Sequence, residues 1–215
     1  MKPNDPHRNG LVLSAGQPLD QAAGVLILVH GRGDSAAGIL GLVEVLNQPG
    51  FAYLAPQAAG NTWYPHSFLA PIADNEPGIS SGIAALNDAV EMAATAGLPY
   101  ERMVIGGFSQ GACLAAEFAA RNPRRYGGLL IFSGGLIGPD GTPRDYPGNL
   151  AGTPAFLGCS DVDFHIPKER VELSAEVLRK LRAQVTMRLY PGMGHTINQD
   201  EIDFGRELLE TVASG

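Results

Sequence analysis

Short apolar runs alternate with stretches of helical periodicity along most of the chain. Seven runs rich in apolar and β-branched residues lie at 11–15, 24–30, 51–56, 103–108, 128–134, 154–160 and 185–191. Each run ends near Gly, Pro, Ser or His, and short runs bounded in this way predict β-strands. The run "GVLILVH" at 24–30 is almost wholly apolar, which is typical of a strand buried on both faces of a sheet.

Apolar residues at three- and four-residue spacing predict helices between these runs. The predicted helices cover 39–46, 83–94, the segment between Ser109 and Pro123, 171–181 and 204–212. Asp34 or Ser35 can cap the first of them. Strands that alternate with helices predict an α/β fold with a mostly parallel central sheet and helices on both faces. We expect a single domain over residues 1–215, with residues 1–10 as a flexible N-terminal segment.

Two long stretches show no regular pattern. Residues 57–78 and 134–153 are rich in Gly and Pro, and both begin at or just past the end of a predicted strand. Ligands bind at the carboxyl edge of the strands in open α/β sheets, and long loops in compact domains are often functional. We therefore expect these loops to border a functional site.

Composition and charge exclude several classes of protein. The 215 residues are 45% hydrophobic and carry a formal net charge of −7, whereas a nucleic-acid binder normally has a basic surface. The sequence contains no basic amphipathic stretch of the kind that binds membrane surfaces. The N-terminus has no apolar signal region, which favours a cytoplasmic protein. Cys113 and Cys159 are too few for a disulfide framework, so we expect buried free thiols. A monomer and a homodimer both remain open.

The segment "GGFSQG" offers a nucleophile. Gly107 and Gly111 flank Ser109 in a G-x-S-x-G pattern, with a predicted strand before it and a predicted helix after it. Such a turn lifts a serine out of the chain, and glycines remove the side chains that would clash in it. The alternative is an inert serine in a glycine-rich turn, so other parts of the chain must supply its partners.

A serine nucleophile needs a base and an orienting carboxylate. His195 lies in the glycine-rich loop "PGMGH" between the last strand and the last helix, but His66 and His165 also lie in loops. The carboxylate candidates are Asp161 and Asp163, which follow the strand 154–160. The chain order Ser, Asp, His is the order used on the α/β-hydrolase fold. The residues alone leave three bases and two acids open.

The fourth requirement is a pair of amides for an oxyanion. "HGRGD" follows the strand 24–30, and Gly31 and Gly33 form a flexible turn in which the Arg32 amide can face a site. The Gln110 amide, directly after the serine, is the second donor. A phosphate-binding loop is disfavoured because neither G-x-G-x-x-G nor G-K-[ST] is present. No metal site is expected, because H-x-H, H-E-x-x-H and paired C-x-x-C spacings are absent.

Four motifs in this order resemble one known family. "LVHGRGD", "GGFSQGA", "CSDVDFHIP" and "YPGMGHTIN" are similar to motifs of the phospholipase/carboxylesterase family of α/β-hydrolases, which includes the acyl-protein thioesterases. The resemblance covers the chain from about residue 11 onward. It implies the α/β-hydrolase fold and a serine hydrolase that needs no cofactor.

The resemblance also implies roles for individual residues. The family's D-x-x-x-P pattern selects Asp163 over Asp161, and the "GMGH" motif selects His195 over His66 and His165. With Ser109 as nucleophile these form a catalytic triad.

Further site residues come from the same resemblance. The Arg32 and Gln110 amides would form the oxyanion hole, and Gly31 would contact substrate. "NTWYP" is similar to the family's tryptophan segment beside the acyl pocket, so Trp63 and Tyr64 would line the site.

The motifs predict a carboxylesterase for short to medium acyl chains. Thioesterase members of the family tend to carry an apolar residue at the position of Arg32 and W-[FY]-D where this chain has Trp63-Tyr64-Pro65. The alternatives are an acyl-protein thioesterase or lysophospholipase and, in another class, a non-catalytic binding protein on a hydrolase fold. The Arg32 side chain either faces the pocket and favours acidic or polar esters, or faces solvent.

Overall fold

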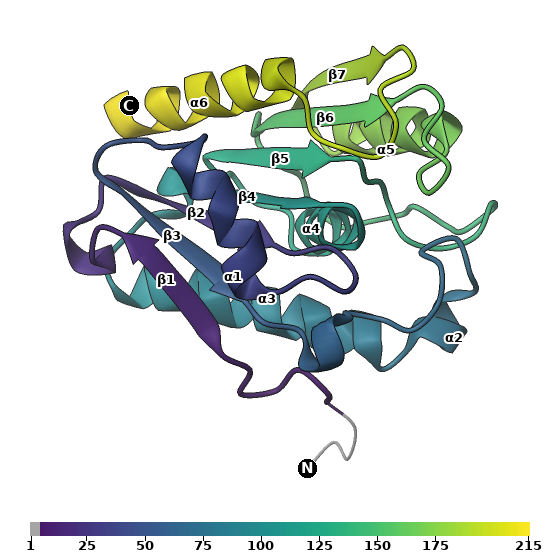
Figure 1. The fold of residues 1–215 in the computed structure, drawn as a ribbon, viewed down its shortest axis with the longest axis horizontal. Helices are drawn as coiled ribbons and strands as arrows, with labels where there is room; N and C mark the ends of the chain where they lie inside the picture. The colour runs from purple at the N-terminus through teal and green to yellow at the C-terminus, as the bar shows by residue number, and fades with distance from the viewer. Residues whose placement is uncertain (1–4) are drawn as a thin grey trace.

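The computed structural model describes residues 5–215, and within them seven strands form one sheet. The strands are β1 (Val12–Gly16), β2 (Gly24–Val29), β3 (Phe51–Pro56), β4 (Met103–Phe108), β5 (Gly128–Phe132), β6 (Pro154–Ser160) and β7 (Gln184–Tyr190). Their order across the sheet is β1-β3-β2-β4-β5-β6-β7 (Figure 1). β1 pairs antiparallel with β3, and all other neighbouring strands are parallel. The predicted mostly parallel sheet is confirmed.

Helices cover both faces of this sheet, as predicted. They are α1 (Ala36–Ile39), α2 (Ile72–Asn75), α3 (Gly78–Thr95), α4 (Gln110–Arg121), α5 (Lys168–Lys180) and α6 (Gln199–Ser214). Short 3₁₀ turns cover Leu19–Gln21, Leu40–Glu44, Ala59–Asn61 and Tyr100–Arg102. Helices α3, α4 and α5 pack on one face, and α1 and α6 on the other (Figure 1). No helix among residues 5–215 is long and apolar enough to cross a lipid bilayer.

Strand burial follows the position of each strand in the sheet. Every residue of β2 and β3 is buried, because helices cover both faces there. β1 lies at one edge and is only partly buried. A central strand is therefore apolar throughout, whereas an edge strand mixes apolar and polar residues, because the two differ in burial.

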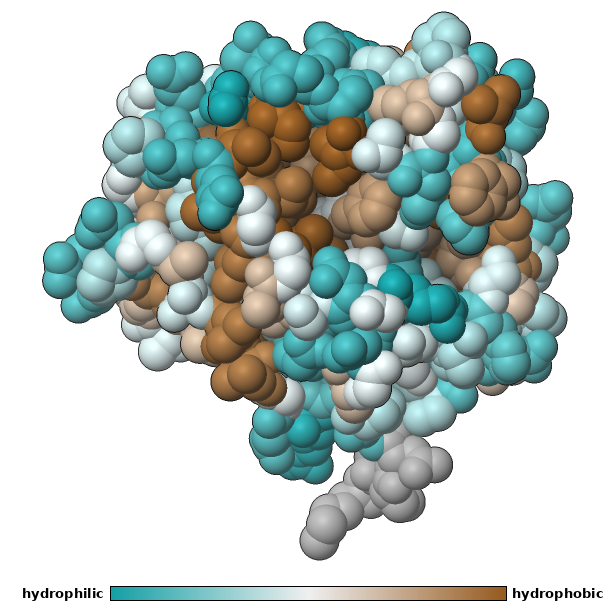
Figure 2. Space-filling model, viewed as in Figure 1, coloured by the Kyte–Doolittle hydropathy of each residue, from teal (hydrophilic) through white to brown (hydrophobic). Residues whose placement is uncertain are grey.

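Two hydrophobic clusters fill the layers above and below the sheet. The larger one joins the sheet to α3, α4 and α5, and the smaller one joins it to α1 and α6. The second layer is less completely covered, since Leu40, Val43 and Phe204 are only partly buried there. Figure 2 looks onto this face and shows apolar side chains gathered along the seam between α1 and α6.

Some helix boundaries differ from the prediction. The predicted helix 39–46 is instead a four-residue α1 that continues as the 3₁₀ turn Leu40–Glu44, and Ser35 is its N-cap. Helix α3 begins at Gly78, earlier than its apolar stripe indicates. The loop 57–78 also contains the short helix α2.

His7 fixes the described part of the N-terminal segment to the rest of the domain, whereas flexibility was expected over residues 1–10. His7 is buried, and its amide donates to Ser81 Oγ (2.8 Å). Its Nδ1 accepts from the Ala59 amide (3.0 Å), so its Nε2–H donates to the Trp63 carbonyl (2.8 Å). Residues 1–4 lie outside the described residues.

Candidate active site

Ser109 occupies the tight turn between β4 and α4. Its φ of 56° and ψ of −120° lie in a region that residues other than glycine rarely adopt. Hydrogen bonds fix the turn, because the Ser109 amide donates to the Phe132 carbonyl (3.0 Å) and the Cys113 amide donates to the Ser109 carbonyl (3.0 Å). Backbone strain of this kind persists where surrounding structure enforces it, and it commonly marks functional sites.

The two flanking glycines are required by close backbone approach. A Cβ on Gly107 would lie 2.6 Å from the Val29 carbonyl oxygen, and one on Gly111 would lie 2.1 Å from the same oxygen. Both distances are far below van der Waals contact. The G-x-S-x-G pattern therefore reflects how tightly β4 and α4 pack against the end of β2.

The structure brings Ser109, His195 and Asp163 into one hydrogen-bonded row. Ser109 Oγ lies 2.8 Å from His195 Nε2, and His195 Nδ1 lies 2.6 Å from Asp163 Oδ2. A carboxylate only accepts hydrogen bonds, so Nδ1 carries the proton and Nε2 is free to accept from the serine hydroxyl. The loop before α6 supplies the histidine, and the turn after β6 supplies the carboxylate.

Asp163 is held as a carboxylate by its surroundings. Burial alone would raise the pKa of Asp163, but hydrogen bonds from His195 and from the His165 and Ile166 amides outweigh burial and lower the pKa. The two amides donate to Oδ1 at 2.8 and 3.1 Å, which leaves Oδ2 for the imidazole. The side chain is therefore ionised and oriented at neutral pH.

The competing candidates are not part of this hydrogen-bonded row. Asp161 accepts a hydrogen bond from the Gly192 amide (2.8 Å) and so braces the loop that carries His195, without touching the imidazole. His66 and His165 both border the pocket, but neither is hydrogen-bonded to Ser109. The ring of His165 instead lies edge-on to the ring of His195, with 4.7 Å between centroids.

The two amides predicted for the oxyanion hole belong to residues of the same pocket. Gln110 is the first residue of α4, and amides in the first turn of a helix have no acceptor within the helix. In the loop after β2, the Gly33 amide donates to Asn61 and the Asp34 amide to Gly31, whereas the Arg32 amide has no acceptor among residues 5–215. Gly31, Arg32, Ser109 and Gln110 all line the pocket.

His30 orients the peptide bond that carries the Arg32 amide. The Ala58 amide donates to His30 Nε2 (3.1 Å), so the ring proton resides on Nδ1, which donates to the Gly31 carbonyl (2.8 Å). Burial lowers the pKa of His30 and keeps the ring neutral. In a trans peptide the N–H points opposite to the C=O, so fixing the Gly31 carbonyl fixes the Arg32 N–H as well. The sequence analysis assigns no role to His30.

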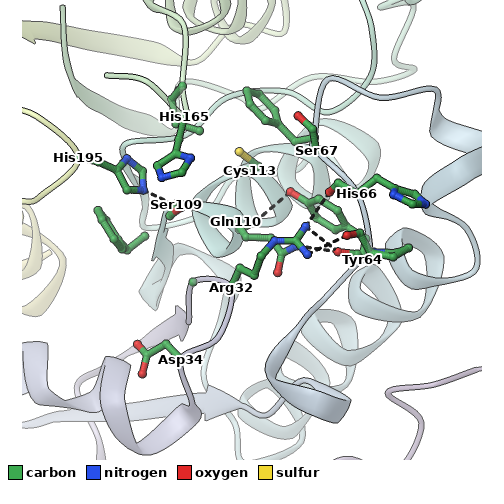
Figure 3. A pocket seen from close by; sticks show the side chains of 15 residues that line it. Arg32, Asp34, Tyr64, His66, Ser67, Ser109, Gln110, Cys113, His165 and His195 are labelled. Carbon is green, nitrogen blue, oxygen red and sulfur yellow. Dashed lines mark hydrogen bonds between the residues drawn. The ribbon is translucent and has the colours of Figure 1, made fainter. Parts of the chain in front are cut away.

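The side chains of both oxyanion-hole candidates bind the loop opposite the serine. The Arg32 guanidinium donates to the carbonyls of Tyr64 (2.9 Å), Pro65 (2.8 Å) and His66 (2.6 Å). Gln110 accepts from the Trp63 amide (3.0 Å) and donates to the Tyr64 carbonyl (2.8 Å). Figure 3 shows Arg32 directed at this loop and Asp34 directed away from it. Arg32 therefore binds the loop while it lines the pocket, which agrees with the expectation that its side chain faces the pocket. A preference for acidic or polar esters stays a prediction.

The pocket has a volume of about 490 Å³ and is lined by Tyr64 as predicted. Trp63 is a correction, because it does not line this pocket. Its ring is fully buried behind the loop, and its Nε1 donates to the His30 carbonyl (2.9 Å). Phe68, Phe108 and Cys113 also line the pocket and escaped the sequence analysis. Of these only Phe108 had a signal, since it lies inside the serine motif.

Both cysteines are free and buried, which confirms the expected thiols. Burial raises the pKa of Cys113 to about 12, and burial together with the neighbouring Asp163 does the same for Cys159. Within residues 5–215 no three His, Cys, Asp or Glu side chains are grouped so that they could hold a metal ion.

A serine raised on a strand–helix turn of a parallel sheet, facing a histidine and a carboxylate from later loops, places the protein in the class of α/β-hydrolases. Comparison with known proteins narrows this class. The model of the family described as Phospholipase/Carboxylesterase matches residues 13–213. The chain belongs to the phospholipase/carboxylesterase family, and it is a serine hydrolase.

Individual relatives agree with this assignment. The structure of a phospholipase/carboxylesterase from Dyadobacter fermentans is 39% identical, with a TM-score of 0.90, and the match covers 94% of this chain and 97% of that one. Acyl-protein thioesterase 1 of Eremothecium gossypii is 30% identical, over 82% of this chain and 83% of its own. Acyl-protein thioesterase 1 of Saccharomyces cerevisiae is 26% identical, over 91% and 94%. The alternative of a non-catalytic binding protein is set aside.

Proposed function

We propose that the protein is a carboxylesterase that cleaves esters of short to medium acyl chains through Ser109, His195 and Asp163. The observation that carries the proposal is the continuous row of hydrogen bonds from Ser109 through His195 to Asp163, at 2.8 and 2.6 Å, inside an open pocket. These distances meet the geometric requirement for a nucleophile, its base and the base's orienting group.

The reaction follows from the positions of the protons. His195 Nε2 takes the hydroxyl proton as Ser109 Oγ attacks the ester carbonyl, and Asp163 stabilises the imidazolium that forms. The imidazolium then delivers the proton to the departing alcohol oxygen, which leaves an acyl-enzyme. Water activated by the same imidazole releases the acid. The low pKa of Asp163 suits this role, because a protonated Asp163 would no longer stabilise the imidazolium.

The Arg32 and Gln110 amides stabilise the tetrahedral oxyanion. Each such donor is worth about 3 kcal/mol of barrier in enzymes of this kind. The position of Gln110 at the first turn of α4 adds the partial positive charge of the helix N-terminus. The hydrogen bond from His30 to the Gly31 carbonyl holds the other donor in place before substrate arrives.

The lining of the pocket favours short to medium acyl chains. Tyr64 and Phe68 offer apolar surface, but the Arg32 guanidinium and Ser67 border the same space. A long polymethylene chain would remove the Ser67 hydroxyl and the N–H groups of Arg32 that are not bound to the loop from water without offering hydrogen bonds in return, which is unfavourable.

Replacing the nucleophile tests the proposal. We expect Ser109→Ala to lower kcat on p-nitrophenyl acetate by at least about 10⁴-fold, because the acyl-enzyme cannot form. Circular dichroism should show the same fold, since only one oxygen is removed. Ser80→Ala on exposed α3 surface is the matched control and should keep full turnover. A Ser109→Ala variant that still turned over the ester would end the proposal, as would failure of a fluorophosphonate to label Ser109.

An acyl-protein thioesterase is the second candidate, favoured by the names of the relatives in Eremothecium gossypii and Saccharomyces cerevisiae. The chemistry at Ser109 would be the same, and the substrates would be long-chain thioesters. Measuring kcat/KM over an acyl series from acetyl to palmitoyl, as oxygen esters and as thioesters, separates the two. A maximum at long thioesters would favour the second candidate.

A further inference from the structure

Three aromatic rings surround the imidazole of His195. The centroid of Phe108 lies 4.8 Å from that of His195, His165 lies 4.7 Å away, and Phe164 lies 6.4 Å away. Phe108 ends β4, directly before the serine, whereas Phe164 and His165 lie in the turn after β6. Two separate elements thus build one aromatic surface around the same imidazole.

Phe164 is the most exposed large apolar side chain in the described part of the chain, with 80% of its surface accessible. The backbone of its turn is fixed by the His165 and Ile166 amides, which donate to Asp163 Oδ1, and its ring contacts His165 with 4.2 Å between centroids. Phe164 contacts His165, which lines the pocket together with Phe108, so the exposed ring extends the aromatic lining of the pocket beside His195. The residues already assigned to catalysis do not explain its position.

The chemistry of ester cleavage says which part of a substrate this surface meets. The alcohol departs when His195 Nε2 delivers a proton to its oxygen, so that oxygen must lie within hydrogen-bond reach of Nε2. The alcohol's substituent then lies beside the rings around His195. Figure 3 shows Ser109 between His195 and Tyr64, so the acyl group has the opposite side of the serine, towards Tyr64.

We propose that Phe108, Phe164 and His165 form a leaving-group subsite that selects esters of aromatic alcohols; this inference rests on the proposed esterase function. An aryl ring can stack on Phe164 and meet the edge of His165, and aromatic pairs are favoured beyond simple apolar contact. No hydrogen bond joins either ring nitrogen of His165 to another residue within 5–215, so this imidazole can also bind a hydroxyl or carboxyl substituent on the alcohol.

The subsite predicts a preference that depends on the alcohol and not on the acyl group. The test compares benzyl, cyclohexylmethyl and ethyl acetate, which share one acyl group and have unactivated alcohols. In the wild type we expect kcat/KM to be highest for the benzyl ester. In Phe164→Ala the ratio of benzyl to ethyl kcat/KM should fall roughly tenfold, the size expected when about 1.4 kcal/mol of aromatic contact is lost. Phe164→Leu should keep the cyclohexylmethyl rate and lose the benzyl advantage.

Val162→Ala is the matched control, because Val162 is an exposed apolar residue on the same turn, with 62% of its surface accessible, and it does not line the pocket. This variant should leave all three rates unchanged. An unchanged benzyl-to-ethyl ratio in Phe164→Ala would overturn the subsite while leaving the esterase intact. If the wild type cleaved none of the three esters, both the function and the subsite would be wrong. If Phe164→Ala changed only the sedimentation of the protein, the exposed ring would serve contact between two copies and the subsite would likewise be overturned.

Discussion

Arg32 acts at two places in the site through two different groups. Its amide is free for an oxyanion, while its guanidinium binds three consecutive carbonyls of the loop at 64–66. Charge-assisted hydrogen bonds of this kind are among the stronger ones in proteins. The guanidinium therefore holds the wall of the pocket in position, and we expect this role, and not recognition of a carboxylate on the substrate, to dominate.

Replacing Arg32 by leucine tests this. We expect KM to rise by roughly five- to tenfold, because losing the carbonyl contacts costs about 1–1.4 kcal/mol of positioning. The increase should be the same for a neutral ester and for one carrying a carboxylate. Arg32→Lys is the control, since one ammonium can bind only part of the three carbonyls and should give an intermediate KM. A selective loss on the carboxylated ester would show that the guanidinium contacts the substrate.

Single residues were predictable where a motif carries the chemistry. The serine motif, the D-x-x-x-P pattern and the glycine-rich loop of His195 point to the three residues that meet in space. The role of His30 was missed and Trp63 was misplaced, because the tautomer of His30 depends on the distant Ala58 amide and the position of Trp63 on the distant His30 carbonyl. Nothing in "LVHGRGD" indicates that the histidine bonds to the next residue's carbonyl.

At the scale of an element, the first turn of α6 closes the loop that carries His195. Asn198 is the N-cap, its side chain accepts from the Glu201 amide, and the Glu201 carboxylate accepts from the Asn198 amide. Glu201 is fully buried, and its Oε1 has no hydrogen-bond partner within residues 5–215. Burial raises the pKa of Glu201 from 4.5 to about 7, despite the hydrogen bond from Asn198.

This predicts a pH-dependent stability. Below pH 4.5 Glu201 is protonated in both the folded and the unfolded chain, so its ionisation does not change the free energy of unfolding. Between pH 4.5 and 7 Glu201 ionises in the unfolded chain first, and the free energy of unfolding falls. The total loss above pH 7 is about 3 kcal/mol. Glu201→Gln keeps an acceptor for the Asn198 amide and removes the ionisation. In urea unfolding, the free energy of unfolding of the variant should therefore rise relative to that of the wild type between pH 5 and pH 8.

The control for this experiment is Glu207→Gln, on the exposed side of the same helix. Its free energy of unfolding should follow that of the wild type at both pH values. An identical pH dependence in Glu201→Gln and the wild type would contradict the role of Glu201.

Elements were predictable where burial dictates the pattern and were missed where packing overrides it. The apolar runs predict all seven strands. The five central strands need apolar side chains on both faces because they are buried there, whereas the edge strands β1 and β7 are only partly buried. The start of α3 was missed, since Gly78 and Gly82 are poor helix formers. Gly78 is required there by close approach, because a Cβ on it would lie 2.5 Å from the Trp63 carbonyl oxygen. A Cβ on Gly82 would lie 2.8 Å from the Leu114 side chain, which would have to shift.

At the scale of the whole molecule, the N-terminal segment is joined to the site by His7. His7 precedes β1 and joins it to two other parts of the fold. Its amide binds Ser81 on α3, and its ring binds Ala59 and Trp63 in the loop after β3. Removing its ring would leave the Ala59 amide and the Trp63 carbonyl without partners.

We expect His7→Ala to lower the free energy of unfolding by about 2–4 kcal/mol, since two buried polar groups lose their hydrogen bonds and a buried ring is removed. The melting temperature should fall by several degrees. His66→Ala, at an exposed histidine of the same loop region, should change stability by less than about 0.5 kcal/mol. Equal melting temperatures for the two variants would show that the N-terminal segment contributes nothing to the fold.

The two buried thiols decide how the open choice between esters and thioesters can be measured. A thioesterase releases a thiol at every turnover, and a disulfide dye can count it directly. Cys113 and Cys159 are buried, although Cys113 also lines the pocket, and burial raises the pKa of each to about 12, so little of either thiol is the reactive thiolate near neutral pH. We therefore expect the native protein to react only slowly with such a dye, so that thiol released above the rate of the enzyme without substrate reports thioester cleavage.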